Sequence, residues 1–339
     1  MPSATHFVLN PRPYPDKVSL VIPVYNEAEV LPLLRQRLSQ LADSLPCELE
    51  ILLVNDGSSD HSMELLMSWA AEDVRVKVLG FARNFGHQIA ITAGLDHASG
   101  DAVVVIDADL QDPPEVVPAM LFEYCRGYDV VYGRRTLRKG ESLFKRFSAW
   151  VFYRLMRAAI HRDLPADAGD FRLISRRCLN ALAQMRETHR FLRGMISWVG
   201  FPQTAVDYER EPRAAGTTKY PLRRMLRFAW TAAISFSPLP LRISFGFAVV
   251  LAAIALTQAI NAIVRTALGL YTVPGWTSLM VVLCLIGSAI LVSIGVLGEY
   301  IARIFEENKR RPLYVITDAI NFPFSEKVQA KSAGSGARV

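Results

Sequence analysis

Residues 102–115 read AVVVIDADLQDPPE, and this stretch decides the fold. Its first part, Ala102–Ile106, is an unbroken apolar run, as expected of a strand that is buried on both faces of a parallel sheet. The triplet Asp107-Ala108-Asp109 follows where that strand should end. The two prolines at 113 and 114 then open a predicted helix through Tyr124, because proline suits the first turn of a helix.

Apolar runs and helical patterns alternate on both sides of this stretch. The predicted strands are Val18–Pro23, Glu48–Asn55, Val76–Phe81 and Asp129–Tyr132, and the helical patterns are Glu27–Leu45, a segment beginning near Asp60, and Gly86–Ala98. Such alternation predicts an α/β fold with a largely parallel sheet and helices on both of its faces. Ligands bind beyond the carboxyl ends of the strands in sheets of this kind, so functional residues are expected where strands stop.

Two long uncharged runs follow in the C-terminal part of the chain. Of the 339 residues 51% are hydrophobic, and no residue from Ile243 to Val264 or from Val273 to Gly298 is charged. Each run is about as long as a membrane-spanning helix, which needs roughly 20 residues. Basic residues gather near the outer ends of both runs, and only Arg265 lies between them. This asymmetry predicts a two-span hairpin whose two ends face the cytoplasm.

Two further segments combine aromatic, apolar and basic residues. Residues 142–161 and 221–237 are predicted to form helices that lie in the membrane interface, with their cations toward the headgroups. The alternative is that they are ordinary amphipathic helices packed against the soluble domain.

Composition and missing motifs exclude several classes of protein. The net charge of +6 comes without a nucleic-acid-binding motif, and attraction to anionic lipid explains the basic residues more simply. The four cysteines have no CxxC spacing and indicate neither a zinc site nor a disulfide framework. No GxGxxG or GxxxxGK[ST] sequence follows a strand. Met1–Asp16 lacks an apolar core, so the catalytic part is expected to stay in the cytoplasm.

The carboxylates at the end of the 102–106 strand are the strongest local signal of chemistry. Asp107 and Asp109 are two residues apart on an extended segment, so their side chains point the same way. Two converging carboxylates repel each other unless a cation lies between them. Oxygen ligands favour Mg²⁺ or Mn²⁺, ions that complete their coordination with substrate phosphates, and Gln111 offers a further oxygen. Acidic pairs also occur in ordinary loops, but the position at a strand end favours metal binding.

Polar clusters also follow the first two predicted strands. PVYNE (23–27) contains Tyr25, whose ring can lie against a nucleotide base, and NDGSSD (55–60) contains two carboxylates that can accept hydrogen bonds from uracil or ribose. Turn and helix-cap chemistry is the alternative for these residues. We favour the cap for Asp60 and ligand binding for Asp56.

The next two strand ends carry nitrogen-bearing side chains. His87 is interpreted as the start of a helix, with a direct chemical role as the alternative. Arg134 and Arg135 follow the strand Asp129–Tyr132, where guanidinium groups are suited to hold a diphosphate.

Taken in order, these motifs resemble those of the family 2 glycosyltransferases of GT-A fold. PVYNE, NDGSSD, DADLQDPPE, GDFRL (169–173) and TKY (218–220) occur in the sequence typical of the subgroup that includes dolichyl-phosphate mannose synthases and bacterial polyprenyl-phosphate glucosyltransferases. The resemblance covers about residues 18–315, including both uncharged runs.

The resemblance implies site residues one by one. The implied nucleotide-sugar contacts are Pro23, Tyr25, Glu27, Asp56, Asp107, Ala108, Arg135, Arg213 and Lys219. The implied metal ligands are Asp107, Asp109 and Gln111, and the implied catalytic residues are Asp109, Asp170 and Arg172. Lys145 and Arg146 either receive the phosphate of a lipid acceptor or simply attract headgroups.

The resemblance also implies an activity and a location. The expected reaction is metal-dependent transfer of a hexose, with UDP-glucose as the first expectation, to undecaprenyl phosphate for cell-envelope glycan modification. A phosphate monoester is already an anion at neutral pH, so Asp170 is expected to orient groups rather than act as a base. Direct displacement would invert the anomeric carbon. The implied protein is a homo-oligomer, with a tetramer as one option, in a bacterial inner membrane, with both termini cytoplasmic.

Three rival functions remain from the sequence. A processive polysaccharide synthase shares the catalytic domain, but it usually has more spans and a QxxRW segment. A non-catalytic membrane scaffold would not need the acidic and basic residues that this chain retains. A transferase for a soluble acceptor would differ only in its acceptor.

The predicted organisation follows from these segments. It comprises an N-terminal extension (1–16), a GT-A catalytic domain (17–220), a juxtamembrane helix (221–237), two transmembrane helices within 238–304 (about 240–266 and 274–300), and a cytoplasmic tail (305–339) whose end is expected to be disordered.

Overall fold

The computed structural model describes residues 9–135, 168–209, 239–268 and 275–322. The predicted interfacial helices at 142–161 and 221–237 lie outside these residues, as do Lys145, Arg146, Arg213 and Lys219. The chain divides into two compact units. The first comprises residues 1–153, 161–219 and 310–339, and the second comprises 154–160 and 220–309.

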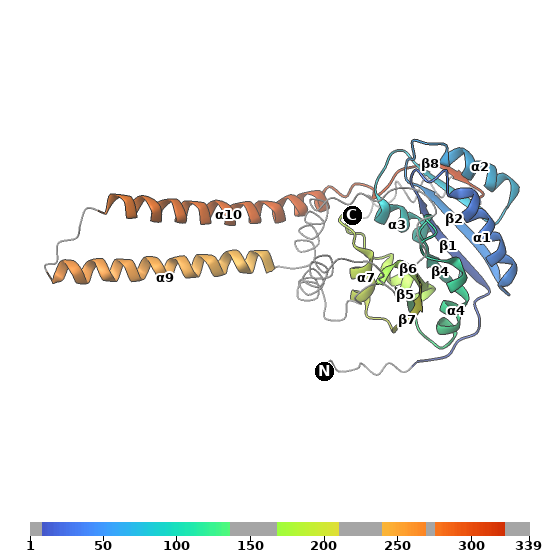
Figure 1. Ribbon diagram of the computed structural model, residues 1–339, viewed down its shortest axis with the longest axis horizontal. Helices are drawn as coiled ribbons and strands as arrows, with labels where there is room; N and C mark the ends of the chain where they lie inside the picture. The colour runs from blue at the N-terminus through green and yellow to red at the C-terminus, as the bar shows by residue number, and fades with distance from the viewer. Residues whose placement is uncertain (1–8, 136–167, 210–238, 269–274, 323–339) are drawn as a thin grey trace, which may run out of the picture. The chain divides into compact units, whose positions relative to one another are not determined.

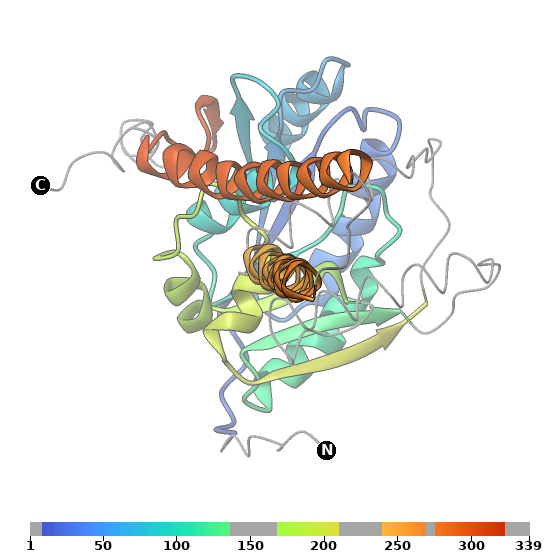
Figure 2. The same cartoon turned by 90° about the vertical axis from the view of Figure 1, so that its left-hand side faces the viewer.

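A mixed eight-stranded sheet lies at the centre of the first unit (Figure 1). Its order is β7-β5-β6-β4-β1-β2-β3-β8, so β7 and β8 form the two edges (Figure 2). The strands are β1 (Lys17–Val24), β2 (Glu48–Asn55), β3 (Val76–Phe81), β4 (Ala102–Val105), β5 (Val130–Arg135), β6 (Ala168–Ser175), β7 (Gln203–Tyr208) and β8 (Ile316–Ile320). The four strands β4-β1-β2-β3 are parallel, whereas β6 and β8 run antiparallel to their neighbours.

Helices cover both faces of this sheet. They are α1 (Leu31–Ser44), α2 (Ser62–Glu72), α3 (His87–His97), the 3-10 turn η1 (Pro114–Val116), α4 (Val117–Cys125), α6 (Arg176–Leu182) and α7 (Leu192–Val199). Alternation along β1 separates two cores, because Leu20 and Ile22 pack with α1, α2 and α4 while Val21 packs with α3, α6 and α7. The predicted α/β sheet with helices on both faces is confirmed.

The helix expected over Glu27–Leu45 begins later, at Leu31. The backbone N–H of Glu27 donates to the hydroxyl of Ser62 (3.0 Å), and that of Ala28 donates to the carboxylate of Asp60 (3.1 Å). Side chains at the start of α2 and in the loop before it therefore bind these N–H groups, while the carbonyl of Glu27 already accepts the backbone N–H of Leu31 at 3.1 Å.

A polar cluster is buried near the amino ends of the central strands. Glu50 on β2 is 2% exposed and accepts hydrogen bonds from Lys77 on β3 (2.6 Å), from the hydroxyl of Ser19, and from the backbone and hydroxyl of Ser99 (2.8 Å each). Burial alone would raise the pKa of Glu50, but these donors lower it below its ordinary value. The cluster joins three strands to the loop before β4.

We expect Glu50→Gln to destabilise the fold at pH 7. A lowered folded pKa means that the carboxylate stabilises the protein above its unfolded pKa and that this contribution is lost as the pH falls. The expected loss is about 1–3 kcal/mol at pH 7, as for other charged groups in buried hydrogen bonds. In thermal unfolding, the difference in midpoint temperature between the variant and wild type should become smaller below about pH 4. Glu72→Gln, at an exposed pair with Arg35, is the matched control and should leave the midpoint nearly unchanged. A difference in midpoint that stays constant across this pH range would contradict a stabilising role for the ionised carboxylate of Glu50.

The second unit contains two long helices that contact each other, α9 (Leu239–Ala267) and α10 (Trp276–Asn308). Their bounds agree with the two uncharged runs, although α10 continues past the expected end at residue 300. Large apolar side chains on both are exposed, including Phe245 (72%) and Leu291 (71%). Among the described residues only one stretch, Leu285–Asn308, is long and apolar enough to cross a membrane, while Ser244–Gln258 forms a shorter apolar helix. The two-span hairpin therefore stays a prediction.

Candidate active site

Loops that carry the predicted site residues follow β1, β2, β3 and β4. Because these four strands are parallel neighbours, their carboxyl ends meet at one edge of the sheet. β6 lies beside β4 in the antiparallel direction, with Arg172 opposite Val105, so the start of β6 lies at the same edge. Five segments that are far apart in the sequence are thereby brought together.

The loops after β1 and β2 are joined by hydrogen bonds. The backbone N–H of Asn26 donates to Ser58 Oγ (3.0 Å), and Asn26 Oδ1 accepts from the backbone N–H of Ser59 (2.8 Å). Asn26 has a φ of 54°, a left-handed conformation that asparagine tolerates better than most residues. Tyr25 is 48% exposed beside this joined pair of loops, Pro23 is buried, and Glu27 is half-buried. The two motifs form one surface.

Asp60 serves the start of α2. Its Oδ1 accepts from the backbone N–H of Ser62, the first residue of α2, at 3.0 Å, and its Oδ2 accepts from Ala28. Burial would raise the pKa of Asp60, but these hydrogen bonds lower it. Its carboxylate therefore holds two backbone N–H groups, but Asp60 lies one residue before the N-cap of α2, which is His61.

Asp56 holds the loop after β3. It is 2% exposed, and its carboxylate accepts from the backbone N–H groups of Phe85 (2.7 Å) and Gly86 (3.0 Å). Burial raises its pKa, and these hydrogen bonds act in the opposite direction. The neighbouring Gly57 has a φ of 66°, and a Cβ there would lie 2.5 Å from the carbonyl carbon of Arg83. Only glycine fits this close approach between the two loops.

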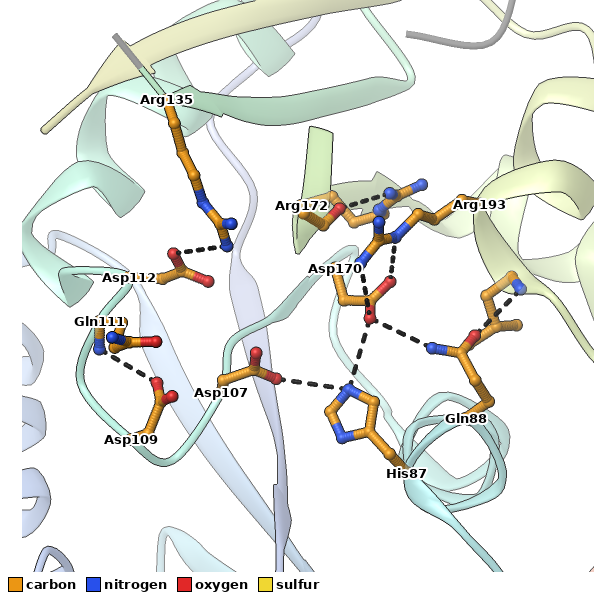
Figure 3. Close-up of polar contacts among 12 residues, drawn as sticks. His87, Gln88, Asp107, Asp109, Gln111, Asp112, Arg135, Asp170, Arg172 and Arg193 are labelled. Atoms are coloured by element: carbon orange, nitrogen blue, oxygen red, sulfur yellow. Dashed lines mark hydrogen bonds and ion pairs between the residues drawn. The ribbon is translucent and has the colours of Figure 1, made fainter. Parts of the chain in front are cut away.

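Asp107 lies among other carboxylates (Figure 3). Its Oδ1 is shielded from solvent and has no hydrogen-bond partner among the described residues, although His87 Nε2 lies 3.5 Å away. Burial raises the pKa of Asp107 to about 6, and Asp170, Asp112 and Asp109 add to the shift while His87 opposes it. Negative charge at this edge is therefore incompletely balanced by the protein.

The rest of the DADLQD loop turns sharply after Asp107. Ala108 is buried, and Asp109 Oδ1 accepts the backbone N–H of Gln111 at 3.1 Å. Leu110, also buried, has a φ of 56°, which is costly for a branched side chain and persists only where the surroundings impose it. The turn thus keeps Asp107 and Asp109 on one short loop.

The donor atoms fit a divalent cation that also binds substrate. The part of the chain that the structure describes contains no group of three or more His, Cys, Asp or Glu side chains able to hold a metal ion by themselves. Asp107 and Asp109 supply hard carboxylate oxygens, and the shielded Oδ1 of Asp107 lacks a donor. Mg²⁺ is commonly bound in this way, by one or two carboxylates together with substrate phosphates.

Asp170 of β6 has the most complete set of partners at this edge (Figure 3). Arg193 of α7 pairs with both of its oxygens (2.8 and 3.2 Å), Gln88 Nε2 donates to Oδ2 (3.1 Å), and His87 Nε2 lies 3.4 Å away. Burial would raise the pKa of Asp170, but the hydrogen bond to His87 and the nearby Arg193 hold it well below its usual range. Asp170 is therefore a firmly ionised carboxylate.

His87 lies between two carboxylates. Burial alone would lower its pKa, but its hydrogen bond to Asp170 and the charge of Asp107 raise it. The sequence interpretation as the start of a helix is correct, since α3 begins at His87. Its position between Asp107 and Asp170 depends on β6 lying next to β4, which no local pattern indicated. Gln88 and Arg193 were missed for the same reason.

Arg172 differs from what its predicted catalytic role suggests. It is 5% exposed, and its Nη2 donates to the carbonyl of Gly169 at 2.7 Å. Burial lowers its pKa to about 10, with Asp170 opposing. Asp170 was expected to orient Arg172, but the carboxylate of Asp170 pairs with Arg193 instead.

Arg135 ties the far side of the site together. Its Nε donates to the hydroxyl of Tyr208 on β7 (3.1 Å), and its Nη2 lies 3.5 Å from Asp112 Oδ1. Tyr208 in turn donates to Asp112, which is buried. A cation is thereby held beside the DADLQD loop. The other two predicted phosphate contacts, Arg213 and Lys219, lie outside the described residues.

Comparison with known proteins identifies the family. Residues 19–182 match the profile of Glycosyl transferase family 2. The chain is 45% identical to "Uncharacterized glycosyltransferase YkcC" of Bacillus subtilis (strain 168) over 298 residues, which cover 88% of this chain and 92% of that protein. The chain therefore belongs to glycosyltransferase family 2, as its motifs predicted.

Other relatives have more specific names. "Bactoprenol glucosyl transferase" of Shigella phage SfV is 39% identical over 300 residues, covering 88% of this chain and 98% of that protein. Among solved structures, the mannosyltransferase PcManGT from Pyrobaculum calidifontis in complex with GDP-Man and Mn²⁺ aligns with 17% identity and a TM-score of 0.42, over 85% of this chain and 90% of that one.

We expect Asp107→Asn to stabilise the protein when no metal is present. The folded pKa of about 6 lies above the ordinary value of 3.8, so ionised Asp107 destabilises the fold above about pH 6 and has no effect below about pH 4. At pH 7.5 the free energy of unfolding of the variant should exceed that of wild type by at most about 3 kcal/mol. Thermal unfolding in EDTA at pH 7.5 and pH 4 checks this. Added Mn²⁺ should stabilise wild type but not the variant, and an unchanged midpoint at pH 7.5 would show that the charge is already balanced.

Proposed function

We propose that the protein is an inverting, membrane-anchored transferase that moves glucose from UDP-glucose to a polyprenyl phosphate such as undecaprenyl phosphate, for modification of cell-envelope glycans. The observation that carries the proposal is the carboxylate pair Asp107 and Asp109 at the carboxyl edge of the sheet. The near full-length similarity to a bactoprenol glucosyl transferase supports the choice of sugar and acceptor.

The donor binds over the joined loops after β1 and β2. The exposed ring of Tyr25 is suited to stack on the base, and Glu27 and Asp56 lie on the same loops. Asp56 acts here mainly through the loop it holds, because both of its oxygens already accept backbone N–H groups.

Departure of the nucleotide diphosphate needs positive charge. A divalent cation held by Asp107 and Asp109 supplies such charge when bound, and stabilises the leaving group as a Lewis acid. Arg135, held beside the same loop by Tyr208 and Asp112, is placed to add to this field. Arg213 and Lys219 are proposed to complete it.

The acceptor supplies its own nucleophile. A lipid phosphate monoester is largely a dianion at neutral pH, so one of its oxygens attacks the anomeric carbon without prior loss of a proton. The bond from that carbon to the donor phosphate breaks, UDP leaves, and the configuration inverts. Asp170 is a weak base because its pKa is held low. We therefore assign it an orienting role, through Arg193 and His87.

Transfer should require both aspartates of the loop. Asp107→Ala and Asp109→Ala should each reduce transfer by at least about 100-fold, because each removes a cation ligand from the charge that stabilises the leaving group. Membranes containing each variant are incubated with radiolabelled UDP-glucose and the label in the lipid fraction is counted. Asp43→Ala, an exposed carboxylate on α1, is the matched control.

Four results of this assay would contradict parts of the proposal. Full transfer by both loop variants would remove the metal site. If label enters the lipid from another nucleotide-sugar in a panel and not from UDP-glucose, the transferred sugar is not glucose from UDP-glucose. Long glycan chains on the lipid would indicate a processive synthase, and label only on soluble sugars would replace the acceptor.

Pairing of β8 with β3 supports a membrane topology. The two strands lie in one sheet, one before α9 and the other after α10, so the chain between them must cross any membrane an even number of times. Crossing by α10 alone would separate the two strands. We therefore propose that α9 and α10 both cross, with the catalytic unit and both chain ends in the cytoplasm.

Cysteine labelling can test this topology in a variant without native cysteines. Leu268→Cys, after α9, should react with a membrane-impermeant maleimide in intact cells, because it would lie outside. Val74→Cys, which is 83% exposed on the catalytic unit, should react only after permeabilisation. Labelling of both positions only after permeabilisation would mean that α9 does not cross.

A further inference from the structure

The segment that follows α10 returns to the catalytic unit and packs against it. Residues 313–322, here called the C-terminal strap, include β8, which pairs with β3 from Val78 to Phe81. Beyond the ladder, the backbone N–H of Ala82 donates to the carbonyl of Val315 at 3.1 Å. The strap therefore runs beside β3 up to the loop that follows this strand, residues 82–86.

An aromatic stack connects the strap to that loop. The ring of Tyr314 lies parallel to that of Phe81, with centroids 5.4 Å apart and an interplanar angle of 12°. Phe81 in turn meets Phe85 edge to face, at 5.6 Å and 84°. Tyr314 is 4% exposed and Phe81 is 5% exposed, so the first of these contacts is buried. Phe85 is thus held from the side of the strap.

The far side of the same loop is held by Asp56. Its carboxylate accepts the backbone N–H groups of Phe85 and Gly86, the two residues before α3. Residues 82–84 are exposed, and Gly86 has a φ of 104° without a side-chain cap on α3. The loop is therefore held by Asp56 on one side and, on the side of the strap, by the rings of Phe81 and Tyr314 and by the backbone bond from Ala82 to Val315.

We propose that Tyr314 is a positioning residue for the nucleotide-sugar, acting through Phe81 and Phe85 on the loop that Asp56 holds. The inference rests on the proposed function in taking residues 56 and 82–86 as part of the donor site and UDP as the nucleotide of the donor. The segment that immediately follows the second long helix then shapes donor binding, and the catalytic residues need not move for it to do so. Tyr314 does not touch the donor in this arrangement.

The strap has a second anchor that is independent of the stack. Asn321 Nδ2 donates to the carbonyls of Ala70 and Val76, at 2.7 and 2.8 Å, on the side of α2 and the start of β3. The hydroxyl of Tyr314 also donates to Asp96 (2.9 Å), a bond that does not involve the donor loop. These two contacts provide matched controls, because each can be removed while the stack stays.

The test uses the full-length protein in detergent and four forms: wild type, Tyr314→Leu, Tyr314→Phe and Asn321→Ala. Tyr314→Leu removes the stacked ring but keeps apolar bulk, so the fold is expected to survive. Tyr314→Phe keeps the ring and removes only the hydroxyl, with its hydrogen bonds to Asp96 and Arg186. Two readouts are made, hydrogen exchange of the peptide that contains Phe85 and Gly86, and the affinity for UDP by calorimetry.

We expect Tyr314→Leu alone to speed exchange at Phe85 and Gly86 and to weaken UDP binding, each by about tenfold, the size expected for loss of a buried aromatic contact. Tyr314→Phe and Asn321→Ala should remain close to wild type in both readouts. In turnover, Tyr314→Leu should raise the KM for UDP-glucose more than it lowers kcat.

Three results would overturn the inference. Unchanged exchange in Tyr314→Leu would show that the loop does not depend on the stack. Equal loosening in Asn321→Ala would show a general loss of stability rather than a specific support. Faster exchange with unchanged UDP affinity would show that the support does not serve the donor. Hydrogen exchange and UDP affinity are both measured without an acceptor. If wild type fails to glycosylate polyprenyl phosphate, the proposed acceptor is wrong, but the inference about Tyr314 is not affected.

Discussion

Repulsion among carboxylates at one sheet edge is the constraint on which the rest of the site depends. Asp107 and Asp170 arrive from different strands and share one imidazole, that of His87. The two carboxylates differ in how well their charges are compensated by neighbouring groups. Asp170 receives Arg193 and Gln88 and stays ionised, whereas the Oδ1 of Asp107 has no hydrogen-bond donor among the described residues and its pKa rises to about 6. Negative charge is thus left unbalanced at the edge where we propose that a divalent cation binds.

The other loops at this edge are joined to one another by hydrogen bonds and an ion pair. The loops after β1 and β2 are joined through Asn26, and the loops after β2 and β3 are joined through Asp56. Arg135 is held by Tyr208 and Asp112. Loops are ordinarily the more mobile parts of a protein, but the polar groups of these loops form hydrogen bonds with a neighbouring loop. In the proposed function, this arrangement holds the groups of the site in place before the substrate binds.

The parallel half of the sheet and its polar edge could be predicted from the sequence, because local patterns encode them. The unbroken run Ala102–Ile106, with acidic residues after it, indicates a buried strand and a site at its end. The partners of Asp170 could not be predicted in this way. They depend on β6 lying between β4 and β5, and antiparallel insertion of one strand has no signature in a single segment. Arg193 lies on a short helix whose sequence resembles any other amphipathic helix.

β8 also has a consequence for how the protein is made. During synthesis on the ribosome, β1 to β7 emerge before either long helix, and the outer edge of β3 then has no strand beside it. An unpaired edge strand is a template for association with other chains. The sheet is completed only when the last part of the polypeptide has been translated, after α10. A nascent chain that ends before β8 therefore carries an unfinished sheet.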